Sequence, residues 1–153
     1  MFRAIQILIC YLALSFAVPL YAADKADIAG YVMHVQMTPA VCSFDSSRQK
    51  QRKCLEGYSL TISSLLPEVP VGRDCQTKSS AKLSPLQAKV VARVMPDENA
   101  RVQLWQNVGG CVPMNASQYF RTIINFAERL KIPADLTSPN TIEVQKENLR
   151  QQF

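Results

Sequence analysis

The stretch "LTISSLLPEV", residues 60–69, has the composition of a half-buried β-strand and decides the fold class. Thr61, Ile62 and Leu65 favour a pleated surface that is buried on one side, and Pro67 ends the run. The stretch contains two serines but no histidine that could activate them. We therefore predict a strand that lacks a proton-transfer group.

A second strand is predicted upstream, because the side chains of "GYVMHVQMTP" (residues 30–39) alternate in character until Pro39. We expect one face to consist of Tyr31, Met33, Val35 and Met37, and the other of Val32, His34 and Gln36. The two strands together predict a small antiparallel sheet.

Helices are predicted downstream of the strands. Residues 84–95 begin with Ser84 as N-cap and Pro85 at the first helical position. Residues 99–111 are expected to form a short helix or an extended piece that ends in a glycine turn. Residues 115–133 give the clearest helical pattern. Its apolar stripe consists of Tyr119, Phe120, Ile123, Ile124, Ala127 and Leu130.

The remaining segments are predicted to be loops and one further helix. Residues 46–54 are expected to form a polar loop, and residues 67–82, rich in proline and polar side chains, a long loop. A last helix is expected to begin at Asn140, where Glu143 completes a capping box. Two strands followed mostly by helices indicate an α+β domain.

The first 22 residues have the features of a secretory signal peptide. Arg3 is the only charged residue before Asp24, and an apolar run covers residues 4–18. A small-residue exit that ends at Ala22 resembles a cleavage site. A membrane anchor is the alternative, but a spanning helix needs about 20 apolar residues, and Gln6 interrupts this run. We expect cleavage after Ala22 or Ala23 and a periplasmic or secreted protein.

The length and charge after cleavage limit the class of protein. Removal of residues 1–22 leaves 131 of the 153 residues, enough for a single domain, residues 23–153, with its own core. This part has 16 lysines and arginines against 12 acidic residues, a net charge of +4. That excess is too small to indicate nucleic-acid binding by itself.

Four cysteines follow the signal segment: Cys42, Cys54, Cys75 and Cys111. An even number in an exported chain indicates two disulfides, for which three pairings are possible. A zinc site is the alternative, but no C-x-x-C motif occurs, and the single histidine, His34, is far from any such motif. We expect disulfides, with no metal and no cofactor.

Three segments, in order, resemble the ribonuclease T2 family. "YVMHVQMTPAVC" (residues 31–42) resembles its opening strand, which leads through a proline to a half-cystine. "GYSLTISSLLPE" (residues 57–68) is similar to its first catalytic segment, F-T-I-H-G-L-W-P. "QLWQNVGGC" (residues 103–111), with residues 117–136, resembles the second, H-E-W-x-K-H-G-T-C, and its following helix. The resemblance implies a T2-like fold with the disulfides Cys42–Cys54 and Cys75–Cys111.

The residues that do chemistry in this family are replaced. Family members cleave RNA with one histidine that deprotonates the ribose 2′-hydroxyl and another that protonates the leaving oxygen, while an acid and a lysine assist at the phosphate. The first histidine falls at Ser63. In the second motif, Gln103 and Val108 stand at the histidines, Leu104 at the glutamate and Asn107 at the lysine. The retained residues are Trp105, Gly109 and Cys111.

These replacements predict a protein without RNA-cleaving activity and with no catalytic residues. One positioned acid or base is worth about 10²–10⁴-fold in rate, and loss of a cooperating set removes on the order of 10⁶-fold. His34 is the only imidazole, and its place within a strand favours a structural role over a pH switch.

RNA binding without cleavage is an alternative, as is a ribonuclease with a residual, rewired activity. The candidate contacts to RNA or another anion are Arg48, Lys50, Arg52, Lys53 and Trp105. Cations with an aromatic surface are typical of single-strand binding. An ordinary solvated loop and a core tryptophan explain the same residues, and we favour that explanation.

We therefore expect an exported, catalytically inactive ribonuclease T2-like protein that binds a protein partner or has a structural role in the cell envelope. Family enzymes continue into further strands, whereas this sequence ends at Phe153. The sheet is then expected to expose an edge, and an exposed edge favours self-association or strand addition by a partner.

Overall fold

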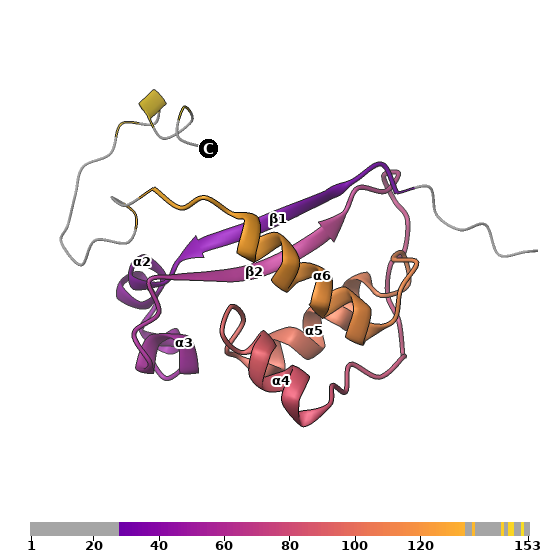
Figure 1. Cartoon of the computed structure of the whole chain (residues 1–153), viewed down its shortest axis with the longest axis horizontal. Helices are drawn as coiled ribbons and strands as arrows, with labels where there is room; N and C mark the ends of the chain where they lie inside the picture. Colours follow the sequence, from indigo (N-terminus) through magenta and orange to yellow (C-terminus); the bar gives the residue numbers. More distant parts are fainter. Residues whose placement is uncertain (1–27, 134–135, 137–144, 146, 149–150, 152–153) are drawn as a thin grey trace, which may run out of the picture.

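The computed structural model of the chain describes residues 28–133, 136, 145, 147–148 and 151. The predicted signal peptide (residues 1–22) lies outside the described residues, as do most residues of the helix expected from Asn140. Within the described part, two strands, five α-helices and one 3-10 helix confirm the α+β class (Figure 1). In chain order they are β1 (Tyr31–Met37), α2 (Thr38–Phe44), η2 (Ser46–Arg48), α3 (Arg52–Leu55), β2 (Leu60–Pro67), α4 (Pro85–Val91), α5 (Glu98–Val108) and α6 (Ala116–Arg129).

Strands β1 and β2 form a two-stranded antiparallel sheet that contains a bulge. The pairing slips by one residue between His34 and Val35, which leaves Ser63 as an extra residue of β2. A slip of one residue exchanges the faces that the following side chains reach, because side chains alternate along a strand.

The bulge corrects the predicted faces of β1. Tyr31 and Met33, before the bulge, pack against the core as expected. After the bulge the prediction is wrong, because Val35 and Met37 are exposed while Gln36 is half-buried. The sequence of β1 gives no indication of this break in alternation, because the extra residue belongs to the partner strand β2.

Residues 38–55 form a small helical unit between the two strands. The polar loop predicted over residues 46–54 is wrong, since this segment contains η2 and α3. Asp45 caps η2 by accepting a hydrogen bond of 3.0 Å from the Ser47 backbone N–H. The Cys42–Cys54 disulfide joins α2 to α3.

The second disulfide, Cys75–Cys111, ties the long loop to the end of α5. Two backbone hydrogen bonds of 2.8 Å support it, one from Gly110 N–H to the Cys75 oxygen and one from Thr77 N–H to the Gln106 oxygen. The loop over residues 67–82 follows the prediction apart from Pro67, which still belongs to β2. Both disulfides have the pairing implied by the family resemblance.

Local capping signals set where the helices begin. The Ser84 hydroxyl accepts from Gln87 N–H at 3.3 Å at the start of α4. Asn115 and Gln118 form a reciprocal capping box at the start of α6. Two helices end earlier than predicted: α4 ends at Val91 in a turn, and α6 ends at Arg129, four residues before the proline.

The core lies between the sheet and helices α4, α5 and α6. Tyr119, Phe120 and Ile123 of α6 are fully buried, and Leu65 of β2 and Trp105 of α5 pack with them. The Tyr119 hydroxyl donates a hydrogen bond of 2.5 Å to the Leu65 backbone oxygen. This bond fixes α6 against β2, and burial raises the pKa of the Tyr119 phenol above its ordinary range.

Candidate functional site

Ser63, which the resemblance aligns with the first catalytic histidine of the ribonuclease T2 family, is the extra residue of the β2 bulge. It is exposed, and its Oγ donates a hydrogen bond of 3.2 Å to the backbone oxygen of His34. The bond uses the main chain of the only histidine, not its imidazole. His34 is itself an exposed residue of β1. The arrangement therefore engages the serine hydroxyl without placing a base beside it.

The four replaced positions on α5 divide between two faces of the helix. Leu104 and Val108 are buried in the core, at the places that the resemblance assigns to the glutamate and the last histidine. Gln103 and Asn107 are exposed. Residues four apart share a face of a helix, so the buried pair packs toward β2 while the exposed pair faces solvent. Apolar core residues thus occupy the two positions that the resemblance aligns with an acid and a histidine.

A small polar hollow of about 80 Å³ lies between β2 and the start of α5. Ser63 and Lys53, which the sequence analysis named separately, both line it. The other polar residues in its lining are Gln36, Thr61 and Asp97. Gln36 reaches the hollow because of the bulge, which no sequence pattern indicated. Asp97, which was not predicted to be a site residue, is the N-cap residue of α5.

The centre of this hollow is a buried ion pair. Lys53 is only 8% exposed, and its Nζ lies 3.8 Å from Asp97 Oδ2. The other oxygen of Asp97 accepts a hydrogen bond of 3.0 Å from the Arg52 backbone N–H. No imidazole and no second carboxylate line the hollow. It has the groups to hold a water or a small polar ligand, but it lacks the two proton-transfer groups that RNA cleavage needs.

The cations of residues 48–53 are mostly engaged with carboxylates. Arg48 Nε lies 2.7 Å from Asp45 Oδ2, and Arg52 Nε lies 2.6 Å from Glu56 Oε1. Lys53 pairs with Asp97, as described above. Lys50 is exposed and has no ion pair among the described residues. Pairing of this kind leaves little free positive charge for phosphates.

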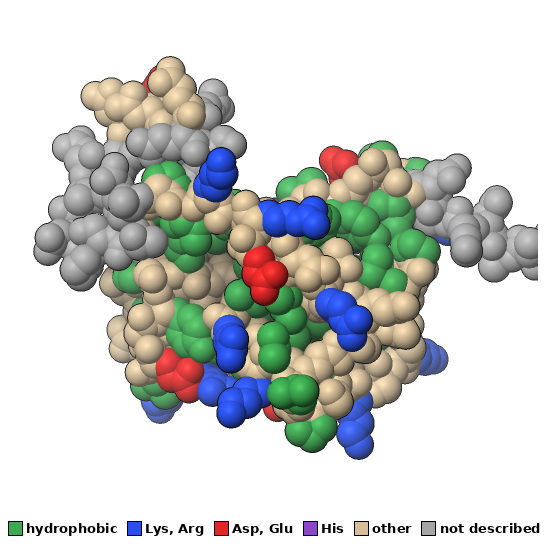
Figure 2. All heavy atoms as spheres, viewed as in Figure 1, with side chains coloured by type: hydrophobic (Ala, Val, Ile, Leu, Met, Phe, Trp, Pro, Cys, Tyr) green, Lys and Arg blue, Asp and Glu red, His purple; other side chains and the backbone are tan. Residues whose placement is uncertain are grey.

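Trp105 lies in the core. It is 2% exposed, its ring packs against Tyr119, and its indole Nε1 donates to Ser79 Oγ at 3.0 Å. In this position it presents no open face to a base. Figure 2 shows lysine and arginine side chains spread over the visible face among apolar and polar groups, rather than gathered in one stripe. Neither feature matches a single-strand binding surface.

The outer edge of β2 is covered by the helical layer. The Ile62 N–H donates a hydrogen bond of 2.9 Å to the Val94 oxygen, which follows α4. The Leu65 oxygen accepts the hydrogen bond from Tyr119. Figure 1 shows β2 between β1 and helices α4 and α5. Two backbone groups of β2 that point away from β1, the Ile62 N–H and the Leu65 oxygen, are therefore satisfied within the fold.

The outer edge of β1 differs, and we call it the β1 edge. Thr38 N–H and the His34 oxygen both bond toward β2, so alternation directs the backbone groups of Met33, Val35 and Met37 outward. Among residues 28–133, no backbone group outside β2 bonds to β1. Val35 and Met37, at 38% and 45%, are also exposed. The described fold thus has one open, apolar strand edge.

Comparison of the chain with protein-family models, with curated proteins and with solved structures finds no match. In the part of the chain that the structure describes, no helix is long and apolar enough to cross a membrane. The same residues contain no group of three His, Cys, Asp or Glu side chains arranged to hold a metal ion. The relation to ribonuclease T2 remains a prediction from sequence motifs.

Proposed function

We propose that this chain is an exported, ribonuclease T2-like protein that does not cleave RNA and binds a protein partner in the cell envelope. The observation that supports it most is the burial of two apolar residues of α5. Leu104 and Val108 are buried in the core where the family has a glutamate and a histidine. Restoring catalysis would require two ionisable groups in an apolar core, at a large desolvation cost.

The β1 edge is the surface that we propose for the partner. An extended segment can add to an open edge, since its backbone satisfies the free N–H and C=O groups and its side chains contact the exposed apolar ones. Strand β1 contains no lysine, arginine, aspartate or glutamate, so it lacks the charges that usually prevent such pairing. RNA binding is supported less well, because Trp105 is buried and three nearby cations are paired.

Incubation of the purified, oxidised protein with homopolymer RNAs from acid to neutral pH tests the absence of cleavage. We expect no turnover above that of a blank preparation. The variants Ser63→Ala and His34→Ala serve as controls, because any chemistry from this region would depend on one of them. Turnover that follows the protein through a second purification step and falls in either variant would contradict the proposal.

Capture of partners from the native envelope fraction tests the β1 edge. We expect the wild-type protein to retain a partner that the variant Val35→Lys fails to retain, because a charge on the edge opposes strand addition. Leu86→Lys is the matched control, since Leu86 is 74% exposed on α4, away from the sheet. Equal retention by both variants would show that the partner binds elsewhere.

A further inference from the structure

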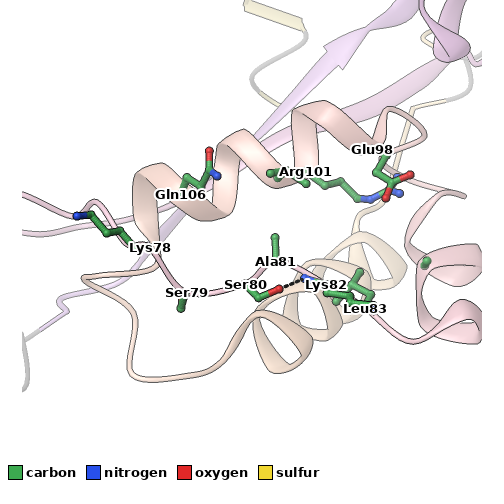
Figure 3. A pocket seen from close by; sticks show the side chains of 11 residues that line it. Lys78, Ser79, Ser80, Ala81, Lys82, Leu83, Glu98, Arg101 and Gln106 are labelled. Atoms are coloured by element: carbon green, nitrogen blue, oxygen red, sulfur yellow. Dashed lines mark hydrogen bonds between the residues drawn. The ribbon is translucent and has the colours of Figure 1, made fainter.

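A larger hollow, of about 570 Å³, lies between α5 and the extended segment of residues 78–83. Figure 3 shows Arg101 and Gln106 on the helix side and Lys78, Ser79 and Ser80 on the segment that runs beside it. None of the five positions replaced in the family motifs lines this hollow. It is therefore separate from both the polar hollow near Ser63 and the β1 edge.

Arg101 is the unusual residue of this pocket. It is 6% exposed, yet no ion pair among the described residues includes it. Its Nη1 donates to the backbone oxygens of Met95 and Pro96, at 2.5 and 3.2 Å. Buried charges in proteins are normally paired, and burial lowers the pKa of this guanidinium. The carboxylates of Glu98 and Asp97 oppose this shift but form no ion pair with Arg101, so its positive charge is compensated only in part.

The rest of the guanidinium is available to a ligand. A guanidinium has five N–H donors, and the two bonds of Arg101 use only Nη1. Its Nε and Nη2 have no hydrogen-bond partner among the described residues. They are not fully enclosed either, because Gln51 Oε1 is the only fully enclosed side-chain nitrogen or oxygen without a partner in the described part of the chain. Arg101 is one of the residues that line the pocket, and these donors form no hydrogen bond within the described fold.

The charges around Arg101 have an excess of one sign. Lys78 and Lys82 also line the pocket, against a single carboxylate, that of Glu98. In Figure 3, Glu98 lies at the Arg101 end of the pocket and Lys78 at the opposite end. Three cations with one acid, around a partly enclosed space, favour a negatively charged ligand.

The wall opposite α5 is held firmly in place. The Trp105 indole Nε1 donates to Ser79 at 3.0 Å, and the Cys75–Cys111 disulfide anchors the start of the segment. The backbone approaches so closely that a Cβ on Gly110 would lie 2.5 Å from the Gln76 oxygen. Only glycine allows this approach. The pocket is thus formed by covalent and hydrogen-bonded contacts, which reduces the ordering cost of binding.

We propose that this pocket, the Arg101 pocket, binds a small organic anion: a phosphate or carboxylate group attached to an apolar body. Arg101 is the buried anchor for the anionic group, and Lys78 and Lys82 are the cations at its rim. The apolar part contacts the apolar residues of the lining, which are Ala81, Leu83, Ala88 and Val102.

Titration of the oxidised protein with phenyl phosphate, followed by ¹H–¹⁵N NMR, tests the proposal. We expect saturable shifts at the amides of residues 78–83 and of Arg101, and weaker binding of inorganic phosphate, which lacks an apolar part. Benzyl alcohol, which lacks the charge, should cause no such shifts. Acetate and benzoate, titrated in parallel, distinguish a carboxylate preference from a phosphate preference.

Variants of the rim provide the decisive comparison. Lys78→Gln with Lys82→Gln should weaken phenyl phosphate binding about fivefold, because each exposed cation contributes modestly. Arg121→Gln with Arg129→Gln is the matched control, since both are exposed cations on α6 that do not line the pocket. Equal weakening in the two double variants, or shifts spread over all surface cations, would overturn the proposal.

Arg101→Gln tests the anchor directly. We expect it to abolish saturable binding, while thermal unfolding measured in parallel reports the loss of its hydrogen bonds to Met95 and Pro96. If this variant unfolds, the rim variants still decide the question. If it is folded and binds phenyl phosphate as the wild type does, Arg101 is not the anchor and the proposal is wrong.

Discussion

Tyr119 connects α6, the longest of the described helices, to the sheet through one buried hydrogen bond. Its hydroxyl donates to the oxygen of Leu65, a residue that is 1% exposed. We expect Tyr119→Phe to lower the free energy of unfolding by about 1–3 kcal/mol, because the Leu65 oxygen would be left buried without a partner. Urea unfolding measures this. Tyr58→Phe, which removes a bond of 3.1 Å to Ala92 from a half-buried ring, should cost less.

The same residue predicts an alkaline limit to stability. Burial raises the pKa of Tyr119 in the folded state above the ordinary value of 10.0, so the unfolded chain loses the proton first as the pH rises. Stability is therefore intact below about pH 10 and falls above it. Unfolding midpoints between pH 8 and 11 should fall more steeply in the wild type than in Tyr119→Phe. Identical slopes would show that Tyr119 does not titrate in this way.

Asp97 lies near the surface, yet we expect its substitution to lower the free energy of unfolding. Asp97→Asn keeps an oxygen for the Arg52 N–H but leaves the buried Lys53 ammonium without its counter-charge. We expect the free energy of unfolding to fall by about 2 kcal/mol. This loss is smaller than the loss from breaking a fully enclosed ion pair, because the Asp97 side chain is 17% exposed.

Asp45→Asn is the matched control for this comparison. Asp45, like Asp97, forms an ion pair, and its partner is Arg48. The side chains of Asp45 and Arg48 are 40% and 50% exposed. Exposed pairs contribute little, so its unfolding midpoint should stay at the wild-type value. If the two variants lose stability equally, the Lys53–Asp97 pair has no special role in the polar hollow.

At the scale of elements, the two disulfides make unequal contributions because they close loops of different length. Cys75–Cys111 spans 36 residues and Cys42–Cys54 spans 12. Chain entropy predicts about 4 and about 3 kcal/mol respectively. Replacement of Cys75 and Cys111 by alanine should therefore lower the unfolding midpoint more than replacement of the shorter bridge, as measured by thermal unfolding. The reverse order would indicate that α2 and α3 depend more on their bridge than loop length implies.

Local signals predicted the elements that depend on near neighbours. The Ser84–Pro85 start of α4 and the Asn115–Gln118 capping box of α6 act within one helical turn, so the sequence reveals them. Helix α3 was missed because the Cys42–Cys54 bridge and the distant Asp97 stabilise a segment whose composition is that of a loop.

The candidate site was predictable only in part, for the same reason. The resemblance singled out Ser63 as a position where a family histidine is replaced. The sequence did not predict that Ser63 would be a bulge residue that lines a hollow with Asp97, because the slip in register arises from long-range strand pairing. The buried charge of Arg101 was likewise not predicted. Its guanidinium is held by the backbone oxygens of Met95 and Pro96, which precede the helix, and the sequence of α5 by itself gives no indication of this contact.

For the whole molecule, the two edges of the sheet have different environments. A two-stranded sheet is only marginally stable by itself. Here the helical layer supports β2, through Ile62 N–H to Val94 and through Leu65 to Tyr119. Among the described residues, strand β1 has backbone hydrogen bonds only to β2. The fold is therefore firm on one side of the sheet and open on the other.

Hydrogen exchange of the isolated protein measures this asymmetry directly. The amides of Met33, Val35 and Met37, directed away from β2, should exchange fast, whereas the Ile62 amide should be protected, because its N–H is bonded to Val94. Addition of the envelope fraction should slow exchange at the three β1 amides and leave Ile62 unchanged. Protection of all four in a protein that light scattering shows to be monomeric would mean that the edge is already covered by this chain. The proposal that a partner adds a strand to β1 would then be wrong.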